Sequence, residues 1–381
     1  MTPKTIDLAN HHNVYIFGAG LSKVRGLPVI GDFMIALRDA HPWLLSEGRR
    51  READAVAKVL QYRLSATAAA YRVKLDLENI EELFSLADAG KEVLSRDVRL
   101  AIAATIDFRR STIEEPFTTF FTPNSFTGPV GWTHTPHGAD QKAFKVSTIE
   151  FFMQALIASD WKSEVVNTIV TFNYDCLVED ALSKLYTPFH YGFKPKSVIV
   201  DPSTSVLQLK ADAELPVLKL HGSTNWARLS SRRATMSVFG GYSDVLARDA
   251  VPELVAPTWR KLLARELLDV WKTALERITV ATRIVVIGFS MPETDMHFKY
   301  LLAAGLRENI SLREIVFVNP DSLTITQRAE SLFGSLENRP PVRIIAKGVG
   351  HFVGAGTSPE QIGSIDRPVP VEITRIQHGA Y

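Results

Sequence analysis

Glycine and small polar residues follow five apolar segments of the chain, each at the point where the segment ends. Glycine lets backbone amides approach an anionic group, while amide, carboxylate and imidazole side chains bind hydroxyls or move protons. In open α/β proteins, ligands bind beyond the carboxyl ends of parallel strands. We therefore treat five segments as one candidate site: Gly18-Ala19-Gly20-Leu21-Ser22, Thr171-Phe172-Asn173-Tyr174-Asp175, Leu220-His221-Gly222-Ser223, Gly288-Phe289-Ser290 and Val318-Asn319-Pro320.

The first of these segments is typical of a phosphate-binding turn. Gly18 and Gly20 would let the backbone approach a pyrophosphate closely. The full dinucleotide fingerprint has a third glycine where Lys23 stands, and an acidic residue about twenty residues later, which is missing here. A tight turn without a ligand explains the two glycines equally well.

Asn173 and Asp175 place an amide and a carboxylate directly after an apolar segment. Held at a sheet edge, the pair could bind a ribose and position a water molecule. The alternative is that one of them only caps the following helix. His221 offers a base that works near neutral pH, and Gly222 would leave its imidazole uncrowded. The alternative for His221 is a structural histidine.

Ser290 is suited to a phosphate or a ribose hydroxyl, and Asn319 to the ribose of an adenosine. Asn319 could equally belong to a simple turn. Asp295 stands where the N-cap of the next helix is expected.

The segments that precede these residues predict the fold. Residues 13–17, 165–172, 217–220, 283–287 and 314–318 are mostly Val, Ile, Leu or Phe without polar alternation. Strands buried on both faces have this composition. Helical patterns follow several of them. The sequence therefore predicts an α/β fold with a Rossmann-like parallel sheet and helices on both faces.

The remaining segments suggest a division of the chain. We expect residues 1–40 and 146–350 to form the Rossmann-like domain. Residues 41–145 are interpreted as a mainly helical insert, because Ala, Leu, Glu, Arg and Lys dominate up to about residue 100. The Pro- and Gly-rich stretch 115–140 is expected to be an irregular loop. Residues 351–381 are interpreted as a C-terminal arm or hairpin.

Composition excludes several classes of protein. The 381 residues carry 43 Lys and Arg against 42 Asp and Glu, so the chain has no general charge for binding nucleic acid or an anionic membrane. The single cysteine, Cys176, permits neither an intramolecular disulfide nor a cysteine zinc cluster. No apolar signal core or long apolar span is apparent. We expect a cytoplasmic protein without a metal.

The motifs, taken in order, resemble the sirtuin superfamily, and specifically the bacterial sirtuin-like NAD-hydrolase branch of anti-phage defence systems. Sirtuin deacylases carry a four-cysteine zinc module that this chain lacks. The resemblance implies that NAD is the substrate and that nicotinamide and ADP-ribose are the products. It implies that Gly18, Ala19, Gly20 and Ser22 hold the pyrophosphate, that Asn173 and Asp175 orient the nicotinamide ribose, that His221 is the base, and that Gly288, Ser290 and Asn319 contact the phosphate and the adenosine ribose.

Two other functions remain open, an NAD-dependent protein deacylase and a non-catalytic subunit that senses NAD or ADP-ribose. A free NAD hydrolase would deplete its own cell, so we expect control by homo-oligomerisation or by a partner. Within the family, a HerA-type hexameric ATPase is the first expectation, and a short prokaryotic Argonaute is the alternative. Neither a membrane nor direct nucleic-acid binding is expected.

The cysteine count gives a first testable prediction. Because one cysteine cannot build a zinc site of the sirtuin type, treatment with a chelator should leave NAD consumption by the purified protein unchanged. A clear loss of NAD consumption that added zinc restores would contradict this prediction.

Overall fold

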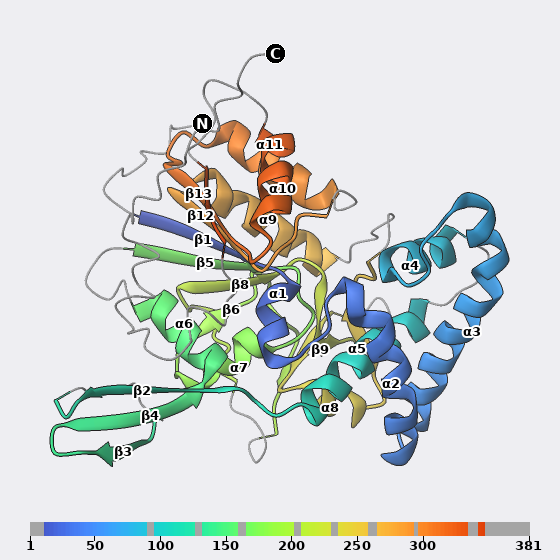
Figure 1. The fold of residues 1–381 in the computed structure, drawn as a ribbon, viewed down its shortest axis with the longest axis horizontal. Helices are drawn as coiled ribbons and strands as arrows, with labels where there is room; N and C mark the ends of the chain where they lie inside the picture. Colours follow the sequence, from blue (N-terminus) through green and yellow to red (C-terminus); the bar gives the residue numbers. More distant parts are fainter. Residues whose placement is uncertain are drawn as a thin grey trace.

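The computed structural model describes residues 11–89, 95–125, 132–158, 165–201, 207–229, 235–257, 265–292, 296–333 and 342–346. Its centre is a seven-stranded parallel sheet in the order β14-β13-β12-β1-β5-β8-β6 (Figure 1). The strands are β1 (His11–Phe17), β5 (Val165–Thr171), β6 (Phe189–His190), β8 (Leu215–Lys219), β12 (Arg283–Ile287), β13 (Glu314–Val318) and β14 (Val342–Ile345). The five predicted strands are therefore confirmed.

The strand order identifies the ligand-binding edge. From β1 the chain adds β5 and β8 on one side, then returns to add β12, β13 and β14 on the other. The order reverses at the boundary between β1 and β12, and in such folds the crevice lies beyond the carboxyl ends of the strands at this boundary. The predicted Rossmann-like α/β class is confirmed.

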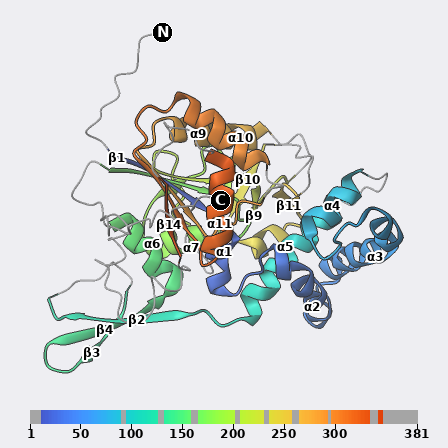
Figure 2. The same ribbon diagram turned by 45° about the horizontal axis from the view of Figure 1, so that its top comes forward.

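Helices cover both faces of this sheet, and its central strands β8 and β12 are buried along their whole length. Figure 2 shows α9 (Arg265–Thr279) and α10 (Met296–Glu308) on one face, with α6 (Thr148–Ala158) and α7 (Leu177–Lys184) on the other. Helix α11 (Ser322–Phe333) packs against β14. The short helix α1 (Ala19–Ser22) and the 3₁₀ turn η1 (Lys23–Arg25) follow β1 directly.

A bundle of helices leaves the sheet after η1 and the 3₁₀ turn η2 (Ile30–Asp32). It consists of α2 (Phe33–Ser46), α3 (Arg50–Val73), α4 (Ile80–Ala89) and α5 (Ser95–Thr112). Helices α2, α3 and α5 pack on one another, at the right of Figure 1. The division of the chain into domains stays a prediction, but these helices agree with the helical pattern of the segment.

The expectation of an irregular loop over residues 115–140 is wrong for its described part. This region contains β2 (Phe117–Pro123) and β3 (His134–His137), which pair antiparallel with β4 (Gln141–Ser147) in a sheet that projects from the body (Figure 1). Pro123 ends a strand and Pro136 lies in an edge strand, positions where a missing backbone donor is tolerated. Proline content was therefore a misleading sign.

A second sheet lies next to the carboxyl end of β8. Its order is β11-β9-β10-β7, formed by β7 (Val198–Ile199), β9 (Gly222–Ala227), β10 (Ser237–Phe239) and β11 (Pro252–Leu254). Helix α8 (Tyr242–Leu246) packs against β9 and β10. At Gly222, φ is +79° and a Cβ would lie 2.1 Å from the Glu253 carbonyl oxygen. This glycine is thus needed for the pairing of β9 with β11, a reason that differs from leaving His221 uncrowded.

A buried ion pair ties the sheet to α7. The Lys219 ammonium at the end of β8 lies 2.8 Å from Glu179 Oε1, and the two side chains are 0% and 1% exposed. Lys219 also donates a hydrogen bond to the Asp175 carbonyl oxygen, and Tyr191 donates one to Glu179. Burial is the largest single influence and lowers the pKa of Lys219, but Glu179, Cys176 and Asp175 together outweigh it, so this pKa is raised.

Breaking this pair should be costly. Lys219→Met leaves the Glu179 carboxylate buried without its cation, and we expect the free energy of unfolding to fall by about 3–5 kcal/mol. The double variant Lys219→Met/Glu179→Gln removes both charges and should recover most of this loss. Urea unfolding of the three proteins measures the effect. A single variant within about 1 kcal/mol of the wild type would contradict the importance of the pair.

Candidate active site

A cavity of about 530 Å³ lies beyond the carboxyl ends of β1, β5, β8, β12 and β13. The predicted site residues that line it are Ala19, Gly20, Ser22, Asn173, Asp175, His221, Gly288, Ser290 and Asn319. Gly18 contributes through its carbonyl oxygen, which accepts a hydrogen bond from Asn173. The parallel sheet thus brings together residues that are up to three hundred positions apart in sequence. Their roles remain predictions.

The glycines at the boundary of β1 and β12 allow two loops to touch through their backbones. The amide of Gly20 donates to the Gly288 carbonyl oxygen at 2.8 Å, and the amide of Gly18 donates to Ile287 at 3.0 Å. A Cβ on Gly288, where φ is +63°, would lie 2.4 Å from the nitrogen of Leu21. These two amides are already bonded within the protein, so the observed role of the glycines is close packing of the cavity floor.

Asn173, Ser22 and Asp175 form a chain of hydrogen bonds between two loops. Asn173 Nδ2 donates to the Gly18 carbonyl oxygen at 2.9 Å and to Ser22 Oγ at 3.0 Å. Ser22 Oγ donates to Asp175 Oδ2 at 2.7 Å. Among the described residues, no donor is bonded to Asn173 Oδ1, so this oxygen is available to a ligand hydroxyl. The network fixes both side chains before any ligand arrives.

Asp175 precedes Cys176, the N-cap residue of α7, and bonds to the start of the helix without being its cap. Its Oδ1 accepts a hydrogen bond from the Leu177 amide at 3.1 Å, at the start of α7. The Asp175 carbonyl oxygen accepts a hydrogen bond from the Lys219 ammonium. The carboxylate therefore has one oxygen directed to the helix start and the other to Ser22. A hydrogen bond to the start of α7 and a place in the site are thus compatible for this residue.

His221 lies within a cluster of aromatic rings. Its imidazole meets the ring of Phe172 edge to face, with centroids 5.1 Å apart, and the Tyr174 ring lies 6.1 Å away. Phe172 in turn stacks on Phe289 at 4.8 Å. The His221 side chain is only 6% exposed. The apolar rings orient the imidazole and limit its access to water, while its place on the cavity wall keeps it within reach of a ligand.

The residues after β12 and β13 are more strongly engaged by their own loops. Asn319 Oδ1 accepts the amide of Asp321 at 3.0 Å, which is the turn that the sequence left as an alternative. Ser290 is exposed, and its carbonyl oxygen accepts a hydrogen bond from Arg328. Its hydroxyl is free of hydrogen bonds to the described residues. Asp295 lies outside the described residues.

Sequence reasoning missed the contribution of the helical bundle. Ile80 and Glu81 of α4 and Ile106 of α5 also line the cavity. Ile80 and Ile106 have the spacing of ordinary core residues, so no local pattern distinguishes them. The phenylalanines Phe172 and Phe289 stand inside the predicted motifs, but only the structure reveals that their rings stack across two strand ends.

The described residues also bear on metal sites and on membrane-spanning helices. In the described parts of the chain, no group of three or more His, Cys, Asp or Glu side chains is arranged to hold a metal ion. Nor do the described helices include one that is long and apolar enough to span a membrane.

Comparison with known proteins gives a family match. A family model described as a SIR2-like domain matches residues 167–339. Among curated proteins, no match was found. Solved structures of Sir2 proteins are similar over most of the chain. One from a study of the mechanism and regulation of Sir2 enzymes has 12% identity and a TM-score of 0.41, covering 95% of this chain and 96% of that one.

A second solved structure, of a mutant Sir2 homologue with 2'-O-acetyl ADP ribose, has 15% identity and a TM-score of 0.39, covering 98% of this chain and 100% of that one. Asn173, Asp175, His221, Gly288, Ser290 and Asn319 all fall within the family match, whereas the Gly18–Ser22 turn precedes it. The family match supports the sirtuin superfamily for residues 167–339, the part of the chain that carries most of the candidate site.

Proposed function

We propose that this protein is an NAD⁺ hydrolase that cleaves the bond between nicotinamide and ribose and releases nicotinamide and ADP-ribose. One observation carries the proposal. The hydrogen-bonded chain of Asn173, Ser22 and Asp175 lies on the same cavity as His221, at the ligand-binding edge of the sheet. The SIR2-like match of residues 167–339 supports a reaction of NAD at this cavity.

Cleavage of the nicotinamide–ribose bond requires little of the protein beyond orientation of the ribose and the attacking water. The bond between ribose C1' and the pyridinium nitrogen breaks, and its electron pair goes to that nitrogen, which becomes neutral. The leaving group therefore needs no strong general acid. Positive charge develops on C1', and the oxygen of a water molecule bonds to it and then loses a proton. A positioned ribose, a positioned water and nearby partial negative charge lower this barrier.

The side chains supply these needs without a metal. Asn173 Oδ1 and the Asp175 carboxylate are acceptors that can hold ribose hydroxyls, and in this proposal the carboxylate also favours the developing cation. His221 takes a proton from a ribose hydroxyl, which adds electron density next to C1'. The rings of Phe172 and Phe289 exclude bulk water from one wall.

The other predicted contacts determine the orientation of the substrate along the cavity. In this proposal the turn of Gly18, Ala19, Gly20 and Ser22 receives the pyrophosphate, with backbone amides that are not bonded within the protein as donors. Gly288, Ser290 and Asn319 lie further along the same edge, where the adenosine ribose and its phosphate would lie. The close packing of Gly20 against Gly288 leaves the floor between them free of side chains.

The sharpest prediction concerns Asn173→Ala and His221→Ala. Each variant removes a positioned polar group, and we expect NAD consumption to fall roughly a hundredfold or more. Asn173→Ala also loses two hydrogen bonds within the protein, so we expect it to unfold about 1–2 kcal/mol more easily. The measurements are NAD consumption per folded molecule, product identity and melting temperature.

Asn167→Ala and His12→Ala are matched controls, because these residues lie toward the amino ends of β5 and β1, away from the cavity. Both controls should keep near-normal turnover. If Asn173→Ala and His221→Ala melt early but still consume NAD at the wild-type rate, the catalytic assignment is wrong. Release of an acyl group from a peptide would point instead to a deacylase. Binding of NAD without turnover, alone or with a partner, would point to a sensor.

We further propose that the activity depletes NAD in bacterial anti-phage defence and is held in check by self-assembly or by a partner. A HerA-type hexameric ATPase is the first partner to test, and a short prokaryotic Argonaute is the second. The support is the family resemblance together with the toxicity of an uncontrolled NAD hydrolase to its own cell.

Light scattering of the purified chain at micromolar concentration should give the mass of an oligomer, and NAD consumption should change when the product of the neighbouring gene is added. A fully active monomer whose rate no such product alters would contradict control of this kind.

A further inference from the structure

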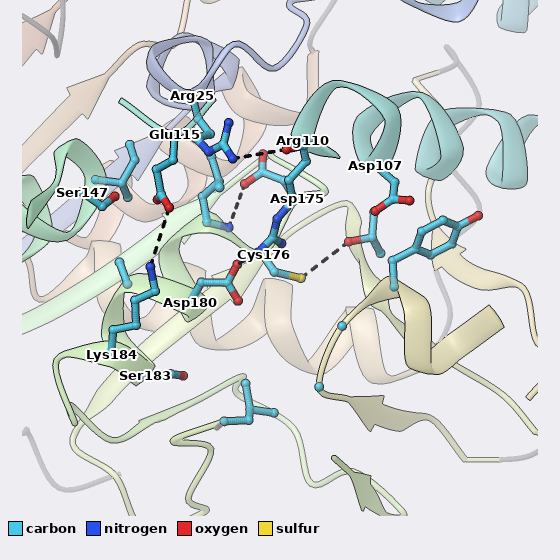
Figure 3. A pocket seen from close by; sticks show the side chains of 18 of the residues that line it. Arg25, Asp107, Arg110, Glu115, Ser147, Asp175, Cys176, Asp180, Ser183 and Lys184 are labelled. Carbon is cyan, nitrogen blue, oxygen red and sulfur yellow. Dashed lines mark hydrogen bonds and ion pairs between the residues drawn. The ribbon is translucent and has the colours of Figure 1, made fainter. Parts of the chain in front are cut away.

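A second cavity, of about 800 Å³, lies between α5 of the helical bundle and helices α7 and α8 (Figure 3). It shares only Asp175 and Ile106 with the candidate active site. Asp175 is therefore part of the wall between the two cavities. The polar residues that line the second cavity include Asp107, Arg110 and Ser111 of α5 and Asp180, Ser183 and Lys184 of α7, none of which belongs to the predicted site.

Arg110, near the end of α5, faces the start of α7 across this cavity. Its guanidinium lies 2.6 Å from Asp180 Oδ2. Asp180 is in the first turn of α7, whose start is bonded to the Asp175 carboxylate. The Asp180 carboxylate raises the pKa of Arg110, burial opposes this, and the nearby Cys176 and Asp175 add to the increase. Arg110 thus lies in the field of the predicted catalytic carboxylate as well as of its own partner.

The same end of α5 is also tied to the loop after β1. Arg25 of η1 donates hydrogen bonds to the carbonyl oxygens of Ile113, at 2.5 Å, and Arg110, at 3.2 Å. The Ile113 side chain packs where a Cβ on Gly26 would lie. The end of α5 therefore contacts the segments that follow both catalytic loops, the one that carries Ser22 and the one that carries Asp175.

We propose that Arg110 is a positioning residue, which holds the loop of Asp175 in its working geometry through Asp180, so that the helical bundle is a required part of the active site. This inference rests on the proposed function. Arg110 does not line the first cavity, and no hydrogen bond or ion pair joins it to Asn173, Ser22 or Asp175. Its effect on the reaction passes through the start of α7 and the carboxylate that the helix start holds.

A second ion pair in the same cavity provides a matched control. Lys184, at the other end of α7, lies 2.6 Å from Glu150 of α6. This pair joins two helices on the same face of the sheet and has no contact with the segment from Asn173 to Asp175. Lys184 also lies 3.9 Å from Glu115, and its charge acts on Asp180 more weakly than that of Arg110. Lys184→Gln therefore changes the charge near Asp180 while the Arg110–Asp180 ion pair stays in place.

The experiment compares Arg110→Gln with Lys184→Gln. For Arg110→Gln we expect kcat for NAD to fall about tenfold, with a smaller change in KM, since displacement of an orienting group weakens the transition state more than binding. Arg110→Lys keeps the positive charge but loses the planar guanidinium, so its kcat should lie between those of Arg110→Gln and Lys184→Gln. Lys184→Gln should keep the wild-type kcat.

Asp180→Asn tests the route of the effect. If Arg110 acts through Asp180, this variant should match Arg110→Gln, and the double variant should be no slower than either single one. Additive losses would overturn the proposed route. Equal kcat values for Arg110→Gln and Lys184→Gln, measured per folded molecule, would overturn the proposal itself.

Hydrogen exchange of the protein without NAD separates this inference from the proposed function. Arg110→Gln should speed the exchange of the amides of Leu177 and Asp180, which are bonded to Asp175 Oδ1 and to the Cys176 carbonyl oxygen, while Lys184→Gln should not. If the wild type fails to consume NAD, the proposed function fails, but the exchange data still decide whether Arg110 orders the loop. Unchanged exchange in Arg110→Gln would overturn the inference alone.

Discussion

The contact between Lys219 and Glu179 holds together the loops that follow β5 and β8. Lys219 ends β8, two residues before His221, and its ammonium reaches the Asp175 carbonyl oxygen and the Glu179 carboxylate beneath the neighbouring loop. Both charges are buried, so neither can leave its partner without a large loss of free energy. The loops of the proposed base and of the proposed ribose-binding carboxylate are therefore joined through Lys219. Rigid support of this kind is what a reaction that relies on orientation requires.

Around this buried pair, the site is built in layers that differ in chemistry. The floor is main chain, since Gly20 and Gly288 meet through their backbones. One wall is a stack of aromatic rings that includes Phe172 and Phe289. The polar groups come from neighbouring strand ends, and Asn173, Ser22 and Asp175 among them are bonded to one another. The helical bundle closes the remaining side, and it contributes both apolar side chains to the cavity and the arginine that reaches α7.

The sequence predicted the parts of the molecule that depend on local pattern. Strands 283–287 and 314–318 are continuous apolar runs, and the structure has them at the same bounds. Because parallel strands align their carboxyl ends, the gathering of Asn173, Asp175 and His221 followed from the strands. The sheet of β2, β3 and β4 was missed because prolines at strand ends and edges look like loop residues. Lys219 and Arg110 form ion pairs with residues that lie 40 and 70 positions away in the sequence. No local pattern reveals such contacts.

The position of Asp175 between two cavities has a thermodynamic consequence. A molecule that settled in the larger cavity would meet the same carboxylate that faces the smaller one. The coupling between two binding sites is reciprocal. If an occupant of the larger cavity lowered the affinity of a nucleotide for the smaller one, the nucleotide would lower the affinity of that occupant by the same factor. A side chain that lines both cavities thus allows two ligands to compete without ever occupying the same space.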